Sequence, residues 1–228
     1  MSEVLARLGT GDKEVQLQKS LLDGKWQYEL IVNGVFIMAS YNDLSSRLLV
    51  RLPLQEEDWQ GEPVRLLVAG LGLGYTVQEA CRFPEIRAID VVEINENVIE
   101  LNRSLLAEEN GHCLSDPRVR VTAADFFDYI SACEARYDLI CMDIDNGPMQ
   151  LARSENSRVY LRDFFRQVRT RLLPGGMFWV WSCGESFQLL RDLERVFDTA
   201  GERVIWEEAG GRSTPYYLYW GRSGGELF

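Results

Sequence analysis

From Val64 onward the sequence alternates between short apolar runs and amphipathic stretches, and this alternation constrains the fold more than any other feature. Nearly continuous apolar runs are typical of strands in a mostly parallel sheet that helices cover on both faces. The expected strands lie at 64–70, 86–93, 118–124, 137–144, 176–182, 202–208 and 214–222. The expected helices lie at 75–83, 95–108, 126–133, 158–172 and 185–199. No helix fits between the last two strands, so we expect an antiparallel hairpin there.

The first sixty residues follow a different pattern, and we treat residues 1–60 as a small module ahead of an α/β domain at 61–228. Short runs rich in β-branched and aromatic residues predict antiparallel strands at 14–20, 26–32 and 35–40. Asp23–Gly24 and Asn33–Gly34 stand between these runs, and such pairs are strong signals for tight hairpins. A helix is expected at 41–52, followed by a polar connector.

The chain is strongly acidic, with 35 Asp and Glu residues against 24 Lys and Arg and a net charge of −11. Nucleic-acid binding demands a basic footprint, so we expect no nucleic-acid partner. The charge suits a small cationic ligand, although acidity also serves solubility alone. No run of about 18 apolar residues occurs, and no basic start precedes an apolar run, so we expect neither a membrane span nor a secretory signal.

Five cysteines are scattered along the chain without metal-ligand spacing. They are typical of reduced cysteines in a cytoplasmic protein, and we expect no metal centre. The only histidine, His112, lies in an expected loop far from any nucleophile signature. This position disfavours a Ser-His-Asp or Cys-His mechanism.

A glycine-rich turn follows the first strand of the α/β domain and opens a helix. Gly70, Gly72 and Gly74 form the pattern G-x-G-x-G. Glycine permits a tight turn and lets the backbone approach a ligand closely. Glu93 ends the next strand, where a carboxylate can accept hydrogen bonds from both hydroxyls of a ribose.

Asp125 stands at the end of the third strand, where its carboxylate can accept from an adenine amino group. Phe126 or Phe127 is placed to pack on a base. Ligands of open α/β sheets bind at the carboxyl ends of strands, and one nucleoside would explain the glycines and both acids together.

Each feature also has a purely structural explanation. The glycines can form a turn without a ligand, Glu93 can be a solvated acid, and Asp125 can cap its helix. NAD is a competing ligand, but Tyr75 occupies the place of the third glycine in G-x-G-x-x-G and would crowd a pyrophosphate. A nucleoside that carries a sulfonium arm has no such phosphate.

The stretch CMDIDNGPMQ, residues 141–150, follows the fourth strand and is the expected catalytic loop. Asp143 and Asp145 would bind a protonated amine and then accept its proton. On an extended strand the two side chains would point to opposite faces, but the turn at Gly147–Pro148 allows both to reach one ligand. The alternative is that Asp143 bonds loop backbone and Asp145 is solvated.

Two further residues are candidates for contact with the substrate. Glu185 follows the fifth strand and is expected to face the same cleft. Tyr160 stands at the start of the helix expected at 158–172 and either lines the substrate pocket or packs in the core. Trp179 and Trp181 are interpreted as core residues.

Parallel strands that end in an antiparallel hairpin resemble the class I methyltransferase variant of the Rossmann-like fold. Residues 64 to about 190 resemble the spermidine synthase (polyamine aminopropyltransferase) family, closest to a short bacterial branch with a DxDNGP loop. The matching stretches are LLVAGLGLGYTVQEA, IDVVEINENVIELNR, DPRVRVTAADFFDYI, YDLICMDIDNGP and VYLRDFFRQVRTRLLPGG. The small β-module ahead of the domain is also similar.

The resemblance implies a donor, S-adenosylmethionine or its decarboxylated form, and a small cationic amine as acceptor. Glu93 would then hold the ribose and Asp125 the adenine. Leu73 stands where the family has an aspartate that contacts the donor amine. Asn146 stands at the place of the presumed base, where it would contact the substrate, and Asp145 is the candidate to replace that base.

Three functions therefore stay open at the level of sequence. The first is transfer of an aminopropyl or related alkyl group to an amine, and the second is methyl transfer, which Leu73 favours. The third is nucleoside binding without catalysis, which Asn146 favours. Family members often form dimers through the N-terminal module, so the resemblance also includes a homodimer as a candidate assembly.

Overall fold

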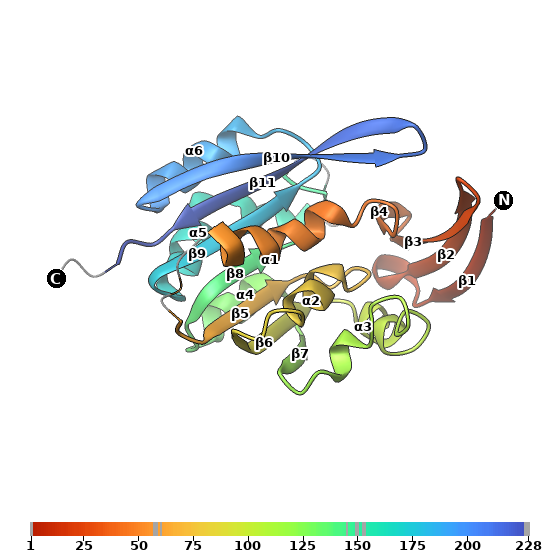
Figure 1. The fold of residues 1–228 in the computed structure, drawn as a ribbon, viewed down its shortest axis with the longest axis horizontal. Coiled ribbons are helices and arrows are strands. Elements are labelled where there is room, and N and C mark those ends of the chain that lie inside the picture. Colours follow the sequence, from red (N-terminus) through yellow and green to blue (C-terminus); the bar gives the residue numbers. More distant parts are fainter. Residues whose placement is uncertain are drawn as a thin grey trace.

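A computed structural model describes residues 2–56, 59, 61–144, 146–148, 151 and 154–225. Its main feature is a seven-stranded sheet of order β10-β11-β9-β8-β5-β6-β7 (Figure 1). The strands are β5 (Val64–Ala69), β6 (Ile86–Glu93), β7 (Val119–Ala123), β8 (Tyr137–Met142), β9 (Leu172–Ser182), β10 (Thr199–Ala209) and β11 (Arg212–Arg222). Five strands run parallel, and β11 pairs antiparallel with both β9 and β10. The predicted parallel sheet with an antiparallel C-terminal hairpin is confirmed.

Helices cover both faces of this sheet. They are α1 (Leu44–Glu56), α2 (Tyr75–Ala80), α3 (Glu96–Arg103), α4 (Phe126–Ala132), α5 (Arg162–Thr170) and α6 (Phe187–Val196), with 3-10 turns η1 (Gly11–Lys13), η2 (Cys113–Ser115) and η3 (Ser154–Tyr160). The helix predicted at 95–108 stops earlier, because the Ser104 hydroxyl bonds the carbonyl of Glu100 and the backbone leaves the helical region. No helix in the described part of the chain is long and apolar enough to cross a membrane.

The N-terminal module is a four-stranded antiparallel sheet of order β1-β2-β3-β4. Its strands are β1 (Ser2–Leu8), β2 (Val15–Leu22), β3 (Lys25–Val32) and β4 (Val35–Ala39). Asp23 and Asn33, each followed by glycine, have φ values of 50° and 52°, as the predicted hairpins require. The strand β1 was not predicted, and it pairs along β2 with one irregularity after Val4.

Two apolar clusters lie on opposite faces of the large sheet, since alternate residues of each strand point to opposite sides. On one face Leu66 and Val68 pack with helices α1 to α3 and with the N-terminal sheet. On the other, Leu67 and Ala69 pack with α4 to α6. The two sheets thus share a core.

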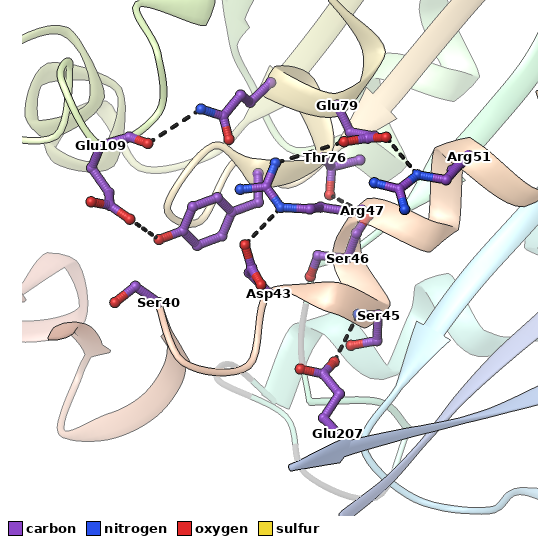
Figure 2. Close-up of polar contacts among 12 residues, drawn as sticks. Ser40, Asp43, Ser45, Ser46, Arg47, Arg51, Thr76, Glu79, Glu109 and Glu207 are labelled. Carbon is purple, nitrogen blue, oxygen red and sulfur yellow. Dashed lines mark hydrogen bonds and ion pairs between the residues drawn. The ribbon is translucent and has the colours of Figure 1, made fainter. Parts of the chain in front are cut away.

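Helix α1 packs on the large sheet, and the predicted boundary at residue 60 stays a prediction. The helix packs against α2 and against β9 and β11. Glu207 of β10, which is 5% exposed, accepts a hydrogen bond of 2.7 Å from the Ser45 N–H in the first turn of α1 (Figure 2). A carboxylate at a helix N-terminus satisfies an unpaired N–H and meets the positive end of the helix dipole.

The buried carboxylate of Glu79 joins α1 to α2. Arg51 and Arg82 bond it at 2.7 and 3.0 Å, and Arg47 approaches within 3.7 Å (Figure 2 draws Arg47 and Arg51). Glu79 is 2% exposed, so its charge must be paired. These contacts hold α1 against α2 near the C-terminal end of α2.

We expect Glu207→Ala to lower the free energy of unfolding by about 1–2 kcal/mol, because the first turn of α1 loses its acceptor in a buried place. Burial raises the pKa of Glu207, so the neutral Glu207→Gln, which keeps an oxygen acceptor, should lose less. Urea unfolding at pH 7 measures both. Glu208→Ala is the control, since that neighbour is exposed; an equal loss there would contradict the capping role.

Candidate functional site

A pocket opens at the carboxyl ends of β5, β6, β7 and β8. Strand β5 lies between β6 and β8, so the chain order reverses at this point, where open α/β sheets bind ligands. The lining residues from these strand ends include Gly70, Gly72, Glu93, Asp125, Phe126 and Asp143. Residues of β3 and β4, among them Leu30 and Met38, form the opposite wall. The strand-end residues predicted from the sequence therefore lie in one pocket.

The glycine turn needs glycine for three different reasons. At Gly70, with φ 90°, a side chain would overlap the carbonyl oxygen of Asp143. At Gly72, with φ 52°, it would press on the Met38 sulfur at 3.0 Å. Gly74, with φ 89°, does not line the pocket; a side chain there would meet the amide oxygen of Asn102 at 2.7 Å. Gly74 was predicted to bind the cofactor; it packs behind the turn, and its contact with a cofactor stays a prediction.

Glu93 is 9% exposed and lies at the pocket wall. Its carboxylate accepts from the N–H of Leu71 at 3.0 Å and from the N–H of Asn95 at 2.8 Å. Burial raises its pKa, while these hydrogen bonds and that of Ile94 oppose the shift. Each carboxylate oxygen keeps a lone pair, so the group can still accept from two ligand hydroxyls.

Asp125 has two partners within the protein. It caps α4 by accepting from the Phe127 N–H at 2.9 Å, as the structural alternative proposed. Its other oxygen accepts from the Arg158 guanidinium of η3 at 2.7 Å. Asp125 also lines the pocket, so the capping role and a binding role are compatible.

Phe126, rather than Phe127, lines the pocket. Phe126 packs edge-on against Phe164 at a centroid distance of 5.5 Å. Phe127 stacks on Phe164 at 5.4 Å and lies under the Arg158 guanidinium, so it supports the wall from behind.

Asp143 lies directly after β8 and beside the glycine turn, and its N–H bonds the carbonyl of Ala69 at 2.8 Å. Burial raises the pKa of its carboxyl to about 6, against hydrogen bonds from the Ser46 and Thr76 side chains that lower it. The Thr76 hydroxyl is 3.4 Å away. Ser46 and Thr76 lie together where α1 meets α2 (Figure 2). An acid with this pKa can exchange a proton near neutral pH.

The remaining predicted residues either do not line the pocket or are not among the residues that the structure describes. Asp145 is outside the described residues. Asn146 donates its amide N–H to the Phe36 carbonyl at 2.9 Å, so it ties the loop to β4. Tyr160 is buried in the core with Val159, as the packing alternative proposed, and Glu185 is exposed. Neither Asn146, Tyr160 nor Glu185 lines the pocket, and their contact with a substrate stays a prediction.

Sequence reasoning missed several lining residues. Trp181 is buried in the core, as predicted, but it also lines the pocket, and its indole N–H donates to the Ser45 hydroxyl at 2.9 Å. Lys13, Met38 and Asn42 reach the pocket from the N-terminal part of the chain. No local signal marks them, because only the packing of the two sheets brings them to the strand ends.

No group of three or more His, Cys, Asp or Glu side chains within the described ranges is arranged to hold a metal ion. The titratable groups among the described residues of the pocket lining are three carboxylates, Glu93, Asp125 and Asp143, and one amine, Lys13. This excess of negative charge favours a cationic ligand.

The sheet order and the glycine turn define a Rossmann-like fold of the class I methyltransferase type. Residues 42–205 match the family described as "Spermine/spermidine synthase domain", and the chain belongs to this family. Two solved structures share the fold: a spermidine synthase in complex with the transition state analogue AdoDATO (TM-score 0.79, 17% identity) and the spermidine synthase of Thermotoga maritima (TM-score 0.77, 16% identity). Each covers 97% of this chain, which in turn covers 74% and 73% of theirs.

Among curated proteins, the polyamine aminopropyltransferase of Synechococcus sp. (strain JA-2-3B'a(2-13)) is 29% identical over 202 residues, which are 84% of this chain and 60% of the relative. Putrescine N-methyltransferase 2 of Nicotiana attenuata is 28% identical over 180 residues, 72% of this chain and 46% of the relative. The chain therefore spans 60% or less of the length of these two relatives.

We expect Gly70→Ala to lower the free energy of unfolding by about 2–4 kcal/mol, because the added Cβ must push apart two backbones. Gly175→Ala is the matched control. Gly175 also has a positive φ, 78°, but a Cβ there meets nothing within 4 Å, so only backbone strain of about 1 kcal/mol is expected. Equal losses in thermal or urea unfolding would contradict the close approach at Gly70.

Proposed function

We propose that this protein transfers an aminopropyl or related alkyl group from decarboxylated S-adenosylmethionine, or from S-adenosylmethionine, to a small amine. The observation that carries the proposal is the shared pocket of Glu93, Asp125 and Asp143 beside the glycine turn. Glu93 would accept from the ribose hydroxyls and Asp125 from the adenine amino group, with Phe126 against the base. Membership of the spermine/spermidine synthase domain family supports this assignment.

The chemistry asks little covalent help from the protein, since a sulfonium is already activated and alignment is the main requirement. The acceptor nitrogen attacks the carbon next to sulfur, a C–N bond forms, and the C–S bond breaks. Sulfur keeps the electron pair and leaves as the neutral thioether of the nucleoside. Asp143 would bind the acceptor ammonium and take its proton, so that the nitrogen lone pair is free to attack.

Methyl transfer is the second candidate, and a specific residue favours it. Leu73, fully buried in the glycine turn, has no carboxylate for the amine of a decarboxylated donor. The similarity to a putrescine N-methyltransferase supports the same alternative. A methyl donor would place the same sulfonium in the same pocket but would leave as S-adenosylhomocysteine.

The proposal includes a small cationic amine as partner and the cytoplasm as compartment. The acidic lining supports the first point. The five cysteines are free, which suits a reducing compartment.

The direct test incubates the protein with each donor and a panel of diamines and polyamines, and follows the nucleoside product by mass spectrometry. Methylthioadenosine is the expected product, and S-adenosylhomocysteine would support methyl transfer instead. Glu93→Ala should weaken nucleoside binding at least about tenfold, because a buried set of hydrogen bonds is lost. Nucleoside binding without turnover for every donor and amine would sink the catalytic proposal.

Because the pKa of Asp143 is raised to about 6, kcat/KM for the acceptor should rise with pH below 6 and level off above it. Only the ionised carboxylate can bind the ammonium and accept its proton. Asp143→Asn should lower kcat by about 100-fold or more and remove this inflection. An unchanged pH profile in the variant would show that another group accepts the proton.

A further inference from the structure

Arg158 makes a set of contacts that neither packing nor the proposed chemistry explains by itself. Its guanidinium lies 2.7 Å from one carboxylate oxygen of Asp125 and 4.4 Å from the centroid of the Phe127 ring. A weaker approach of 4.0 Å joins it to Asp128. Arg158, which belongs to the separate segment η3, therefore contacts the residue that caps α4 and the first turn of α4.

The two oxygens of Asp125 have different fixed partners. One accepts from the Phe127 N–H at 2.9 Å, and the other accepts from Arg158. A carboxylate offers about four lone-pair sites, so two remain for a ligand in the pocket that Asp125 lines. With both oxygens anchored, the carboxylate cannot rotate freely, and the free lone pairs keep one direction.

Arg158 also lies between two residues that form the pocket wall. Asn156 and Val159 of η3 both line the pocket. The ion pair with Asp125 therefore joins η3, which contributes Asn156 and Val159 to the pocket lining, to the segment that follows β7. Loss of this ion pair would free both η3 and the Asp125 carboxylate to move.

We infer that Arg158 is a positioning residue of the nucleoside site, which orients Asp125 as a fixed hydrogen-bond acceptor and holds η3 against the base. This inference rests on the proposed function, because it takes the ligand to be a purine nucleoside. Asp125 would recognise the exocyclic amino group of the purine base. A 6-oxo purine presents a carbonyl oxygen at the same place, and two acceptors facing each other repel.

Because of this ion pair, we expect salt to change the affinity of the pocket even for an uncharged nucleoside. The Arg158 and Asp125 side chains are 36% and 22% exposed, so dissolved ions can screen the pair. Methylthioadenosine carries no charge at neutral pH. Salt should therefore weaken its binding only through charged groups of the protein, such as the Arg158–Asp125 pair.

The experiment measures the affinities of 5′-methylthioadenosine and 5′-methylthioinosine by calorimetry, at low salt and at about 0.5 M NaCl, where screening acts within a few ångströms. The full chain should prefer the adenine nucleoside, and salt should reduce that affinity. Arg158→Met keeps the apolar stem and loses the charge. It should bind methylthioadenosine about fivefold less tightly, with a smaller preference over methylthioinosine and little remaining salt dependence.

Arg166→Met is the matched control. Arg166 pairs with Asp163 on the exposed face of α5 and does not line the pocket, so its loss should change neither affinity nor salt dependence. Equal weakening of both nucleosides by Arg158→Met would overturn the orienting role, and unchanged affinity would overturn the inference entirely. Nucleoside binding without turnover would contradict the proposed transfer reaction but not the positioning role of Arg158. If the unaltered chain binds neither nucleoside, both proposals fail.

Discussion

The contact on which the site depends is the close approach of two backbones, those of Gly70 and Asp143. The Asp143 N–H bonds the carbonyl of Ala69, and the carbonyl of Asp143 lies where a Cβ of residue 70 would stand. The contact brings the ends of β5 and β8 together, since these strands are neighbours. A glycine is required at position 70 because no side chain fits between these two backbone segments. The acid that we propose as the base is therefore placed by the same contact that shapes the glycine turn.

The second organising feature is the way in which helix α1 joins distant parts of the chain. Glu207 of the C-terminal hairpin caps its first turn, and Ser46 of that turn bonds Asp143. Glu79 binds the arginines of α1 from α2. A buried acid with a raised pKa costs stability unless neighbours donate to it, and here the donors belong to elements that pack only in the folded chain. The placement of Asp143, which we propose as the base, and the stability of α1 are thus physically coupled.

Much of the fold could be predicted because its signals are local. Alternating strands and helices, the hairpin pairs at Asp23 and Asn33, and the positions of Glu93, Asp125 and Asp143 at strand ends all follow from short stretches of sequence. The sequence could not show contacts that tertiary packing decides. Gly74 matches the glycine pattern but packs near Asn102, and Trp181 is buried in the core as predicted but also lines the pocket. Periodicity indicates on which face of an element a residue lies. It does not indicate which residues on that face the neighbouring elements leave uncovered.

The sequence by itself therefore determined the order of elements, the strand ends that carry acids and the turns that need a positive φ, because each depends on residues close in the chain. Only the tertiary structure decided which groups meet. Arg158 reaches Asp125 across 33 positions of sequence, and Glu207 reaches Ser45 across 162. Such pairs form when packing brings separate elements together. The pocket, and the partners that orient its acids, are properties of the packed chain rather than of any one segment.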